Sequence, residues 1–210
     1  MRLYGYWRSS AAYRVRIALN LKGIHYEQAV TNLRQGSHRT LDYLVKNPQG
    51  LVPLLEDGEI RLGQSLAIIE YLDEVWPEPP LLPNEPVARA QVRALALAVA
   101  CEIHPLNNLR VLQYLEQRIG LAERYVASWY RHWIAEGFTA LEAQLSTTAG
   151  RYAYGDRVSL ADICLVPQVH NARRYNCDLV PYSTIRRIEA TCLDHPAFET
   201  ARPERQPDAR

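Results

Sequence analysis

The chain opens with RLYGYWRSSAAYRVRIALNLKG (residues 2–23), a stretch that predicts a β-strand leading directly into an α-helix. Polar and apolar residues alternate from Arg2 to Tyr6, as in a strand with one buried face. From Ser10 to Lys22 the apolar residues recur at the spacing of one buried helical face, and Arg14 and Arg16 are expected to face elsewhere. Gly23 then closes the helix. The turn between the two elements therefore lies at a helix N-terminus.

Residues 24–75 continue this alternation of short strands and helices. His25–Val30 has the pattern of a second strand, and a strand–helix–strand unit of this kind is typical of α/β folds. Pro53–Glu56 and Glu59–Leu62 flank Asp57-Gly58, a dipeptide that strongly favours a β-hairpin. Ser65–Val75 returns to helical periodicity. We therefore predict a small mixed sheet with helices on its faces.

A proline-rich segment, residues 76–86, separates this part from one with helical patterns only. Val87 to about Arg118 has the period of a long helix, which Pro105 should bend because proline removes one backbone hydrogen bond. Leu121–Leu145 predicts a second long helix. Ser159-Leu-Ala-Asp162 is a capping-box sequence that should begin a helix running to about Tyr175.

Length and composition are those of an ordinary globular protein. The chain has 210 residues, of which 48% are hydrophobic and 22% charged, and its formal net charge is +1. This balance argues against disorder and against a surface built for nucleic acid. With the patterns above it predicts an α/β domain at residues 1–81 followed by an all-helical domain at residues 87–210.

Cysteines, histidines and the chain start give three further expectations. The four cysteines are far apart and form no C-x-x-C pair, so we expect reduced, mostly buried thiols. The six histidines lack metal-ligand spacing, and no metal site is expected. Neither a signal-peptide pattern nor an apolar run of membrane-spanning length is present, which favours a cytoplasmic protein without a membrane partner.

The turn Trp7-Arg8-Ser9-Ser10 is the first candidate site. Helix N-termini combine unpaired backbone N–H groups with the positive end of the helix dipole, and serine hydroxyls add further donors. Such a turn can hold an anion. Ser9 or Ser10 can also be a simple N-cap, and the two roles are compatible.

Two other short segments could present polar groups to a ligand. Val52-Pro53 opens the first hairpin strand, and a cis bond there would aim the backbone N–H and C=O of Val52 outward. In Gln64-Ser65, Ser65 is expected as the N-cap of the following helix, where it could offer its hydroxyl to a carboxylate.

These segments belong to motifs that resemble the zeta-class glutathione transferases and, within that class, the maleylacetoacetate isomerases. The resemblance covers essentially the whole chain and rests on RSSAAYRVRIALNLKG (8–23), NPQGLVP (47–53), QSLAIIEYL (64–72), IHPLNNLRVL (103–112), LVPQV (165–169) and DLVPY (178–182). It implies a thioredoxin-like N-terminal domain that binds glutathione, an all-α C-terminal domain that shapes the substrate pocket, and a homodimer.

The resemblance also implies roles for individual residues. Ser9 and Ser10 would lie against the glutathione sulfur, and Val52, with Pro53 cis, would form a backbone pair with the cysteinyl unit. The other positions implied to contact glutathione are Gln64 and Ser65 at its γ-glutamyl end, His38 and Gln49 near its glycyl end, and His104, Asn108 and Arg110 on the helical domain. Planar guanidinium groups bind carboxylates bidentately, so Arg8, Arg110 and Arg174 are the candidates for binding a diacid substrate.

The implied activity is glutathione-dependent conversion of maleylacetoacetate, a cis-enedioate, into fumarylacetoacetate during tyrosine and phenylalanine breakdown. A thiolate that adds reversibly to the conjugated carbon allows rotation about the former double bond. Many relatives have cysteine at the position of Ala11, so an activity that requires a protein thiol there is not expected. Isomerisation of maleylpyruvate, conjugation or dehalogenation of α-haloacids, and a non-catalytic binding module stay open as alternatives.

Overall fold

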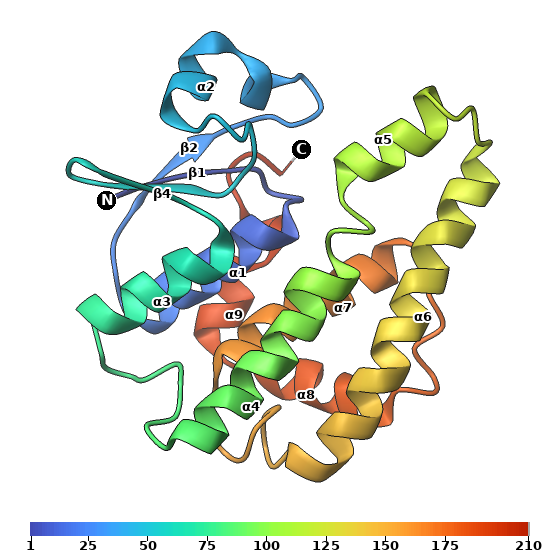
Figure 1. The fold of residues 1–210 in the computed structure, drawn as a ribbon. Coiled ribbons are helices and arrows are strands. Elements are labelled where there is room, and N and C mark those ends of the chain that lie inside the picture. Colours follow the sequence, from blue (N-terminus) through green and yellow to red (C-terminus); the bar gives the residue numbers. More distant parts are fainter. Residues whose placement is uncertain (210) are drawn as a thin grey trace. The chain divides into compact units, whose positions relative to one another are not determined.

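The computed structural model describes residues 1–209, which form two compact units (Figure 1). Unit 1 contains Met1–Pro80 together with the C-terminal segment from Leu193 onward, and unit 2 contains Leu81–Cys192. The C-terminal segment was expected to continue the helical domain of residues 87–210, but by its contacts it belongs to unit 1. Within residues 1–209, no helix combines the length and apolar character that crossing a membrane requires.

Unit 1 is built on a four-stranded mixed sheet, as predicted. Its strands are β1 (Arg2–Gly5), β2 (Glu27–Val30), β3 (Leu54–Asp57) and β4 (Ile60–Gly63), in the order β2-β1-β3-β4. β1 is parallel to β2 and antiparallel to β3, and β3 and β4 form the predicted hairpin. Leu3 pairs with Leu55, and both side chains are buried in the core.

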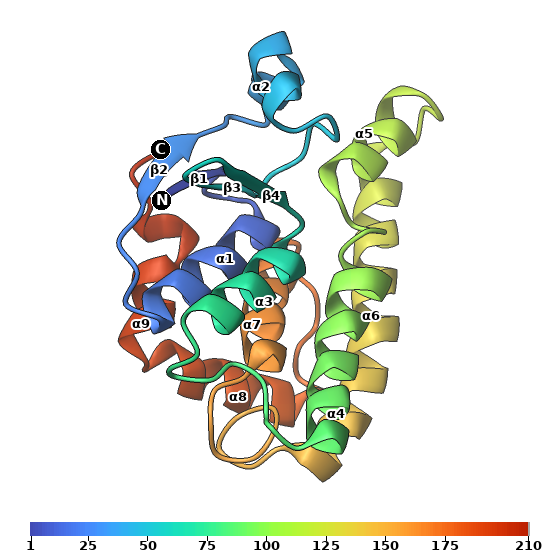
Figure 2. The same cartoon turned by 60° about the vertical axis from the view of Figure 1, so that its left-hand side comes forward.

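Two long helices cover one face of this sheet. They are α1 (Ser10–Leu21) and α3 (Ser65–Val75), which lie side by side, while the short α2 (Leu41–Lys46) lies on the opposite side of the sheet (Figure 2). A 3₁₀ turn, η1 (Ser37–Arg39), precedes α2. Neither η1 nor α2 was predicted, because elements of three and six residues are too short to show a helical period.

The C-terminal segment completes the packing of α1. It contains α9 (Pro196–Ala201) and the 3₁₀ turn η3 (Pro203–Arg205), and α9 packs directly against α1. Arg16 Nε donates to the carbonyl of Ala201 at 3.0 Å. Because α3 and α9 both cover α1, the side chains of Arg14 and Arg16 are buried, so burial is not limited to the one predicted stripe.

We expect Arg16→Met to lower the free energy of unfolding by about 2 kcal/mol, because one buried and one part-buried carbonyl group lose a charged donor. Arg16 is 3% exposed and also donates to Trp7 O at 3.3 Å, while burial lowers its pKa to about 10, so it stays charged at pH 7. Urea denaturation followed by circular dichroism measures the change.

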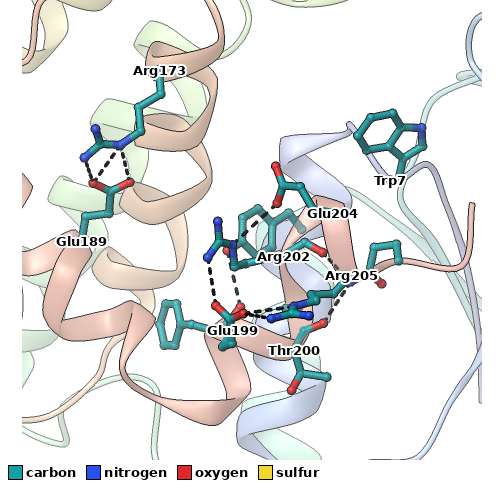
Figure 3. A network of polar contacts seen from close by, with 12 residues as sticks. Trp7, Arg173, Glu189, Glu199, Thr200, Arg202, Glu204 and Arg205 are labelled. Atoms are coloured by element: carbon teal, nitrogen blue, oxygen red, sulfur yellow. Dashed lines mark hydrogen bonds and ion pairs between the residues drawn. The ribbon is translucent and has the colours of Figure 1, made fainter. Parts of the chain in front are cut away.

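Arg202→Met is the matched control for Arg16→Met. Arg202 forms ion pairs with Glu199 and Glu204 in the same segment, but these pairs are partly exposed (Figure 3). Exposed ion pairs contribute less than about 1 kcal/mol. Equal losses in the two variants would contradict the assignment of Arg16 as the buried contact between α1 and the C-terminal segment.

Unit 2 is entirely helical apart from its loops and one isolated bridge between Ala149 and Gly155. Its elements are α4 (Pro86–Leu97), the π-helical segment η2 (Ala98–Ile103), α5 (Leu109–Gln117), α6 (Glu123–Thr148), α7 (Leu160–Arg174) and α8 (Ser183–Leu193). α4 packs on α7, and η2 contacts both α6 and α7. At Gly137 of α6, a Cβ atom would lie 2.3 Å from the side chain of Ile103, so only glycine allows this approach.

The predicted long helix from Val87 to Arg118 is interrupted, not merely bent. The chain leaves helical geometry after Ile103, passes Pro105 in a turn, and begins again at α5. Asn108 supplies the new N-cap, with its side-chain oxygen accepting from Arg110 N at 3.2 Å. A good N-cap three residues after a proline favours a new helix over a bend.

The predicted capping box of α7 is confirmed. Asp162 Oδ2 accepts from the backbone N–H of Ser159 at 2.8 Å and from its hydroxyl at 2.9 Å, and Oδ1 accepts from Ala153 N at 2.8 Å. The Asp162 side chain is fully buried. One carboxylate therefore joins the start of α7 to the loop before it.

The four thiols are free, as expected, and two of them, Cys164 and Cys192, are buried. Cys192 Sγ lies 3.8 Å from Asp162 Oδ1. Burial and the neighbouring carboxylate raise the pKa of the Cys192 thiol far above its ordinary value, so it stays protonated. Cys101 is exposed, in contrast to the expectation of mostly buried thiols.

Candidate functional site

Ser9 is the N-cap of α1, so the capping role is confirmed. Its Oγ accepts from Ala12 N at 3.2 Å, and its backbone N–H donates to Tyr6 O at 2.9 Å. Because Oγ acts as an acceptor toward the helix, the hydroxyl proton can be donated in another direction. Ser10, the first residue of α1, is 5% exposed. The turn thus places one partly exposed hydroxyl at a helix N-terminus, where anions are favoured.

The backbone just before Ser9 is held by charged side chains of the same unit. Trp7 N donates to Asp208 Oδ2 at 3.0 Å, and Trp7 O accepts from Arg16 Nη2 at 3.3 Å. The guanidinium group of Arg8 lies 4.3 Å from the centre of the Trp7 ring, a cation–π arrangement. The sequence analysis predicted neither Arg16 nor Asp208 as a partner of this turn. Asp208 is about two hundred residues away from it in the chain.

The segment before β3 presents a second group of polar atoms. The Val52–Pro53 bond is cis. Leu51 O accepts from Tyr43 OH at 2.6 Å and from Asn47 Nδ2 at 2.8 Å. The backbone on the N-terminal side of Val52 is therefore held by two side chains.

Gln64 and Ser65 lie where β4 turns into α3. Ser65 is the first residue of α3 and not its N-cap; Gln64 is the N-cap, in a backbone conformation with φ of 68°. The predicted N-cap position of Ser65 is therefore wrong by one residue. Ser65 is 7% exposed and its Oγ accepts from Arg14 Nη1 at 3.3 Å, a buried contact that the sequence did not indicate. Gln64 Nε2 donates to Gln49 Oε1 at 2.9 Å, which brings these two predicted residues together.

His38 lies in η1, whose backbone is close to Gly50, the residue after Gln49. A Cβ atom at Gly50, where φ is +58°, would lie 3.0 Å from His38 O, so η1 packs tightly on the residue next to Gln49. Burial and the charge of Arg39 lower the pKa of His38 below its ordinary value, which keeps the ring neutral at pH 7. Its Nδ1 is buried, with no hydrogen-bond partner in the part of the chain that the structure describes. Such an atom fits a polar ligand group.

The remaining predicted residues belong to unit 2. Asn108 is the N-cap of α5, Arg110 is exposed on that helix, and His104 ends the π-helical segment. These three are close in sequence on both sides of one helix start. Arg174 lies at the end of another helix of unit 2, α7.

Arg173 and Arg174 differ in what they contact. Arg173 forms a close ion pair with Glu189 of α8, whose side chain is 6% exposed (Figure 3). Arg174 is exposed, and its guanidinium group lies 4.9 Å from the centre of the Tyr175 ring. Arg173 is thus occupied within the fold, whereas Arg174 has the exposed guanidinium group that a carboxylate needs.

Comparison with known proteins shows the family of the chain. The model of the glutathione S-transferase N-terminal domain matches residues 1–74, and that of the C-terminal domain matches residues 124–197. The chain therefore belongs to the glutathione S-transferase family.

Several similar proteins are isomerases of maleyl compounds, and one of their solved structures is described as zeta class. The chain is 54% identical over 209 residues to a probable maleylacetoacetate isomerase of Vibrio cholerae, covering 99% of this chain and 97% of that protein. It is 47% identical to the maleylpyruvate isomerase of Ralstonia sp, with full coverage of both. Two solved structures match this chain over its full length and over their own. One is a zeta-class maleylpyruvate isomerase in its holo form, with 47% identity and a TM-score of 0.98. The other is a maleylacetoacetate isomerase from Methylobacterium extorquens AM1 with malonate and glutathione bound, with 45% identity and a TM-score of 0.97.

Proposed function

We propose that this protein is a glutathione-dependent isomerase that converts maleylacetoacetate into fumarylacetoacetate. The observation that carries the proposal is the N-terminus of α1, where the partly exposed hydroxyl of Ser9 lies in the unit that resembles glutathione-binding domains. Full-length similarity to maleylacetoacetate isomerases supports the choice of substrate.

The residues of unit 1 fit a tripeptide thiol. Glutathione offers a thiol, two peptide groups and charged ends, which need hydroxyl, backbone and side-chain partners. Unit 1 presents the Ser9 hydroxyl, the Val52 backbone, the linked amides of Gln49 and Gln64, and the buried, unpartnered Nδ1 of His38. Glutathione bound along these groups would satisfy an imidazole nitrogen that the protein leaves without a partner.

When bound, glutathione supplies a thiolate that adds reversibly to the conjugated carbon of the cis-enedioate and leaves again after rotation. The chain's own task is to keep that sulfur ionised. A free cysteine-type thiol has a pKa near 8.5, so only a few per cent is ionised at pH 7. In the proposal, Ser9 donates a hydrogen bond to the sulfur, and the positive end of the α1 dipole favours its negative charge. Ser10 supports the same turn from within the fold.

Arg8, Arg110 and Arg174 are proposed to bind the carboxylates of the substrate. We expect Arg174→Gln to raise KM about 10-fold, since a bidentate charged pair is lost, and to leave the free energy of unfolding within about 0.5 kcal/mol of wild type. Arg173→Gln is the neighbouring control. It should leave KM unchanged and lower the free energy of unfolding, because it leaves the buried Glu189 carboxylate without its partner. Steady-state kinetics and urea denaturation of both variants measure the contrast. A normal KM in Arg174→Gln would remove it from the substrate site.

Maleylpyruvate is the second candidate substrate. The 47% identity with a maleylpyruvate isomerase supports it. The two substrates share the cis-enedioate group and differ by a short acyl extension. Measuring kcat/KM for both, with and without catalytic glutathione, tests the proposal. We expect turnover only with glutathione and a higher kcat/KM for maleylacetoacetate. A preference for maleylpyruvate would select the alternative, and no turnover of either by the folded protein would contradict the enzymatic proposal.

A cytoplasmic homodimer completes the proposal, on the basis of the resemblance to the zeta class. Sedimentation equilibrium should then give twice the chain mass of 24.0 kDa. A mass of one chain at micromolar concentration would contradict the dimer while leaving the proposed reaction unaffected.

A further inference from the structure

The carbonyl group of Leu51 is held more firmly than an ordinary loop carbonyl. Tyr43 OH donates to it at 2.6 Å and Asn47 Nδ2 donates to it at 2.8 Å. Tyr43 and Asn47 are 5% and 6% exposed, so both donor side chains are held within the core. A carbonyl oxygen has two lone pairs, and here each has a side-chain donor.

Both donors are themselves fixed. Asn47 Oδ1 accepts from Gln49 N at 3.2 Å, which sets the orientation of the amide and leaves Nδ2 facing Leu51. Burial raises the pKa of Tyr43 to about 12, so its hydroxyl stays protonated at any working pH. The Tyr43 ring also packs edge-on against the Tyr4 ring, with 6.0 Å between their centres.

Fixing the Leu51 carbonyl also fixes the N–H of Val52. The two groups belong to one planar peptide unit, and because the Leu51–Val52 bond is trans they point in opposite directions. The N–H of Val52 therefore points away from Tyr43 and Asn47. No group within residues 1–209 accepts a hydrogen bond from it, so it is available to an extended ligand.

We propose that Tyr43 and Asn47 are positioning residues that hold the Val52 N–H toward a peptide carbonyl of the bound tripeptide thiol. The inference rests on the proposed function, which makes Val52 the backbone partner of the cysteinyl unit. Neither residue touches the ligand. They keep the Val52 N–H in one orientation before the ligand arrives. Less conformational entropy is therefore lost when the ligand binds.

The test compares glutathione with an analogue in which the cysteinyl carbonyl is reduced to a methylene group and cannot accept a hydrogen bond. Isothermal titration calorimetry gives Kd for wild type, Tyr43→Phe and Asn47→Asp, a variant that keeps the acceptor for Gln49 N but cannot donate to Leu51. We expect both variants to bind glutathione about 5- to 10-fold more weakly than wild type. All three proteins should bind the analogue with similar, weaker affinity, because it makes no bond to the Val52 N–H.

Tyr4→Phe is the matched control, because its hydroxyl bonds to Glu56 of the same unit and not to Leu51. It should bind glutathione as wild type does. Unchanged glutathione binding in Tyr43→Phe and Asn47→Asp would overturn the inference, as would an equal loss for glutathione and the analogue, which would mean general loosening of the loop. Absence of glutathione binding in wild type would instead reject the proposed function, and this inference with it.

Discussion

Asp162→Ala should lower the free energy of unfolding by about 4 kcal/mol. The carboxylate accepts from two backbone N–H groups and one hydroxyl, and alanine leaves all three buried donors without an acceptor. Each such group costs about 1–3 kcal/mol, and the start of α7 loses its capping box as well. Urea denaturation at pH 7 measures the change.

Asp156→Ala is the control for this prediction. Asp156 lies in the same loop region and accepts from Arg151 N at 2.8 Å, but it is exposed, so water can replace its oxygen. We expect it to cost less than about 1 kcal/mol. If Asp162→Ala cost no more than Asp156→Ala, the buried carboxylate would not be the link between α7 and the preceding loop.

The same carboxyl group should make stability depend on pH. Burial raises the pKa of Asp162 from 3.8 to about 6, so the folded chain binds a proton more tightly than the unfolded chain. The resulting stabilisation is complete below pH 3.8 and is lost as the pH rises through about 6. Asp162→Asn cannot titrate. Its stability relative to wild type should therefore improve by about 1 kcal/mol between pH 5 and pH 7, and a constant difference would contradict the raised pKa.

Removing the hydroxyl groups of Ser9 and Ser10 together should lower kcat/KM at pH 7 by about 10- to 100-fold. A hydrogen bond donated to a thiolate is worth about 1.5–3 kcal/mol, and its loss raises the pKa of the bound thiol. The acidic limb of the pH–rate profile should move upward by about 1 to 2 pH units, with activity recovering at high pH. The pH dependence of thiolate absorbance in the glutathione complex measures the same change without turnover.

Single variants separate capping from chemistry. Ser9→Gly loses the hydroxyl but keeps most of the capping preference, and Ser9→Asn keeps the cap without the hydroxyl. Both should show the raised thiol pKa while remaining close to wild type in stability. A pH–rate profile that stays unchanged in Ser9→Gly and in the double variant would remove the two serines from the mechanism.

Local patterns predicted those parts of the fold whose determinants are close together in sequence. The strand and helix of residues 2–23, the hairpin around Asp57-Gly58 and the capping box at Ser159 each depend on residues a few positions apart, and all are present. The bounds of α3 also agree with the prediction. The interruption after Ile103 was predicted only as a bend, because helical periodicity alone does not show where a new N-cap takes over.

The remaining features depend on contacts that local patterns do not contain. The burial of Arg16 requires Ala201, which is about 185 positions away, and a charged residue on the second face of a helix is ordinarily solvated. At the candidate site, motif resemblance indicated Ser9, Val52 and Ser65, but not the side chains behind them. The position of Tyr43 was not predicted, because its helix, α2, is only six residues long and shows no helical period in the sequence.

The return of the last residues to the first unit also affects biosynthesis. A ribosome releases the chain from its N-terminus, and domains ordinarily fold in that order. Here the partners of Arg16 and Asn20, Ala201 and Ala197, are made after Leu81–Cys192, which is one continuous stretch. Unit 2 can thus reach its native packing while the first segment of unit 1 still lacks the α9 contacts that complete the covering of α1.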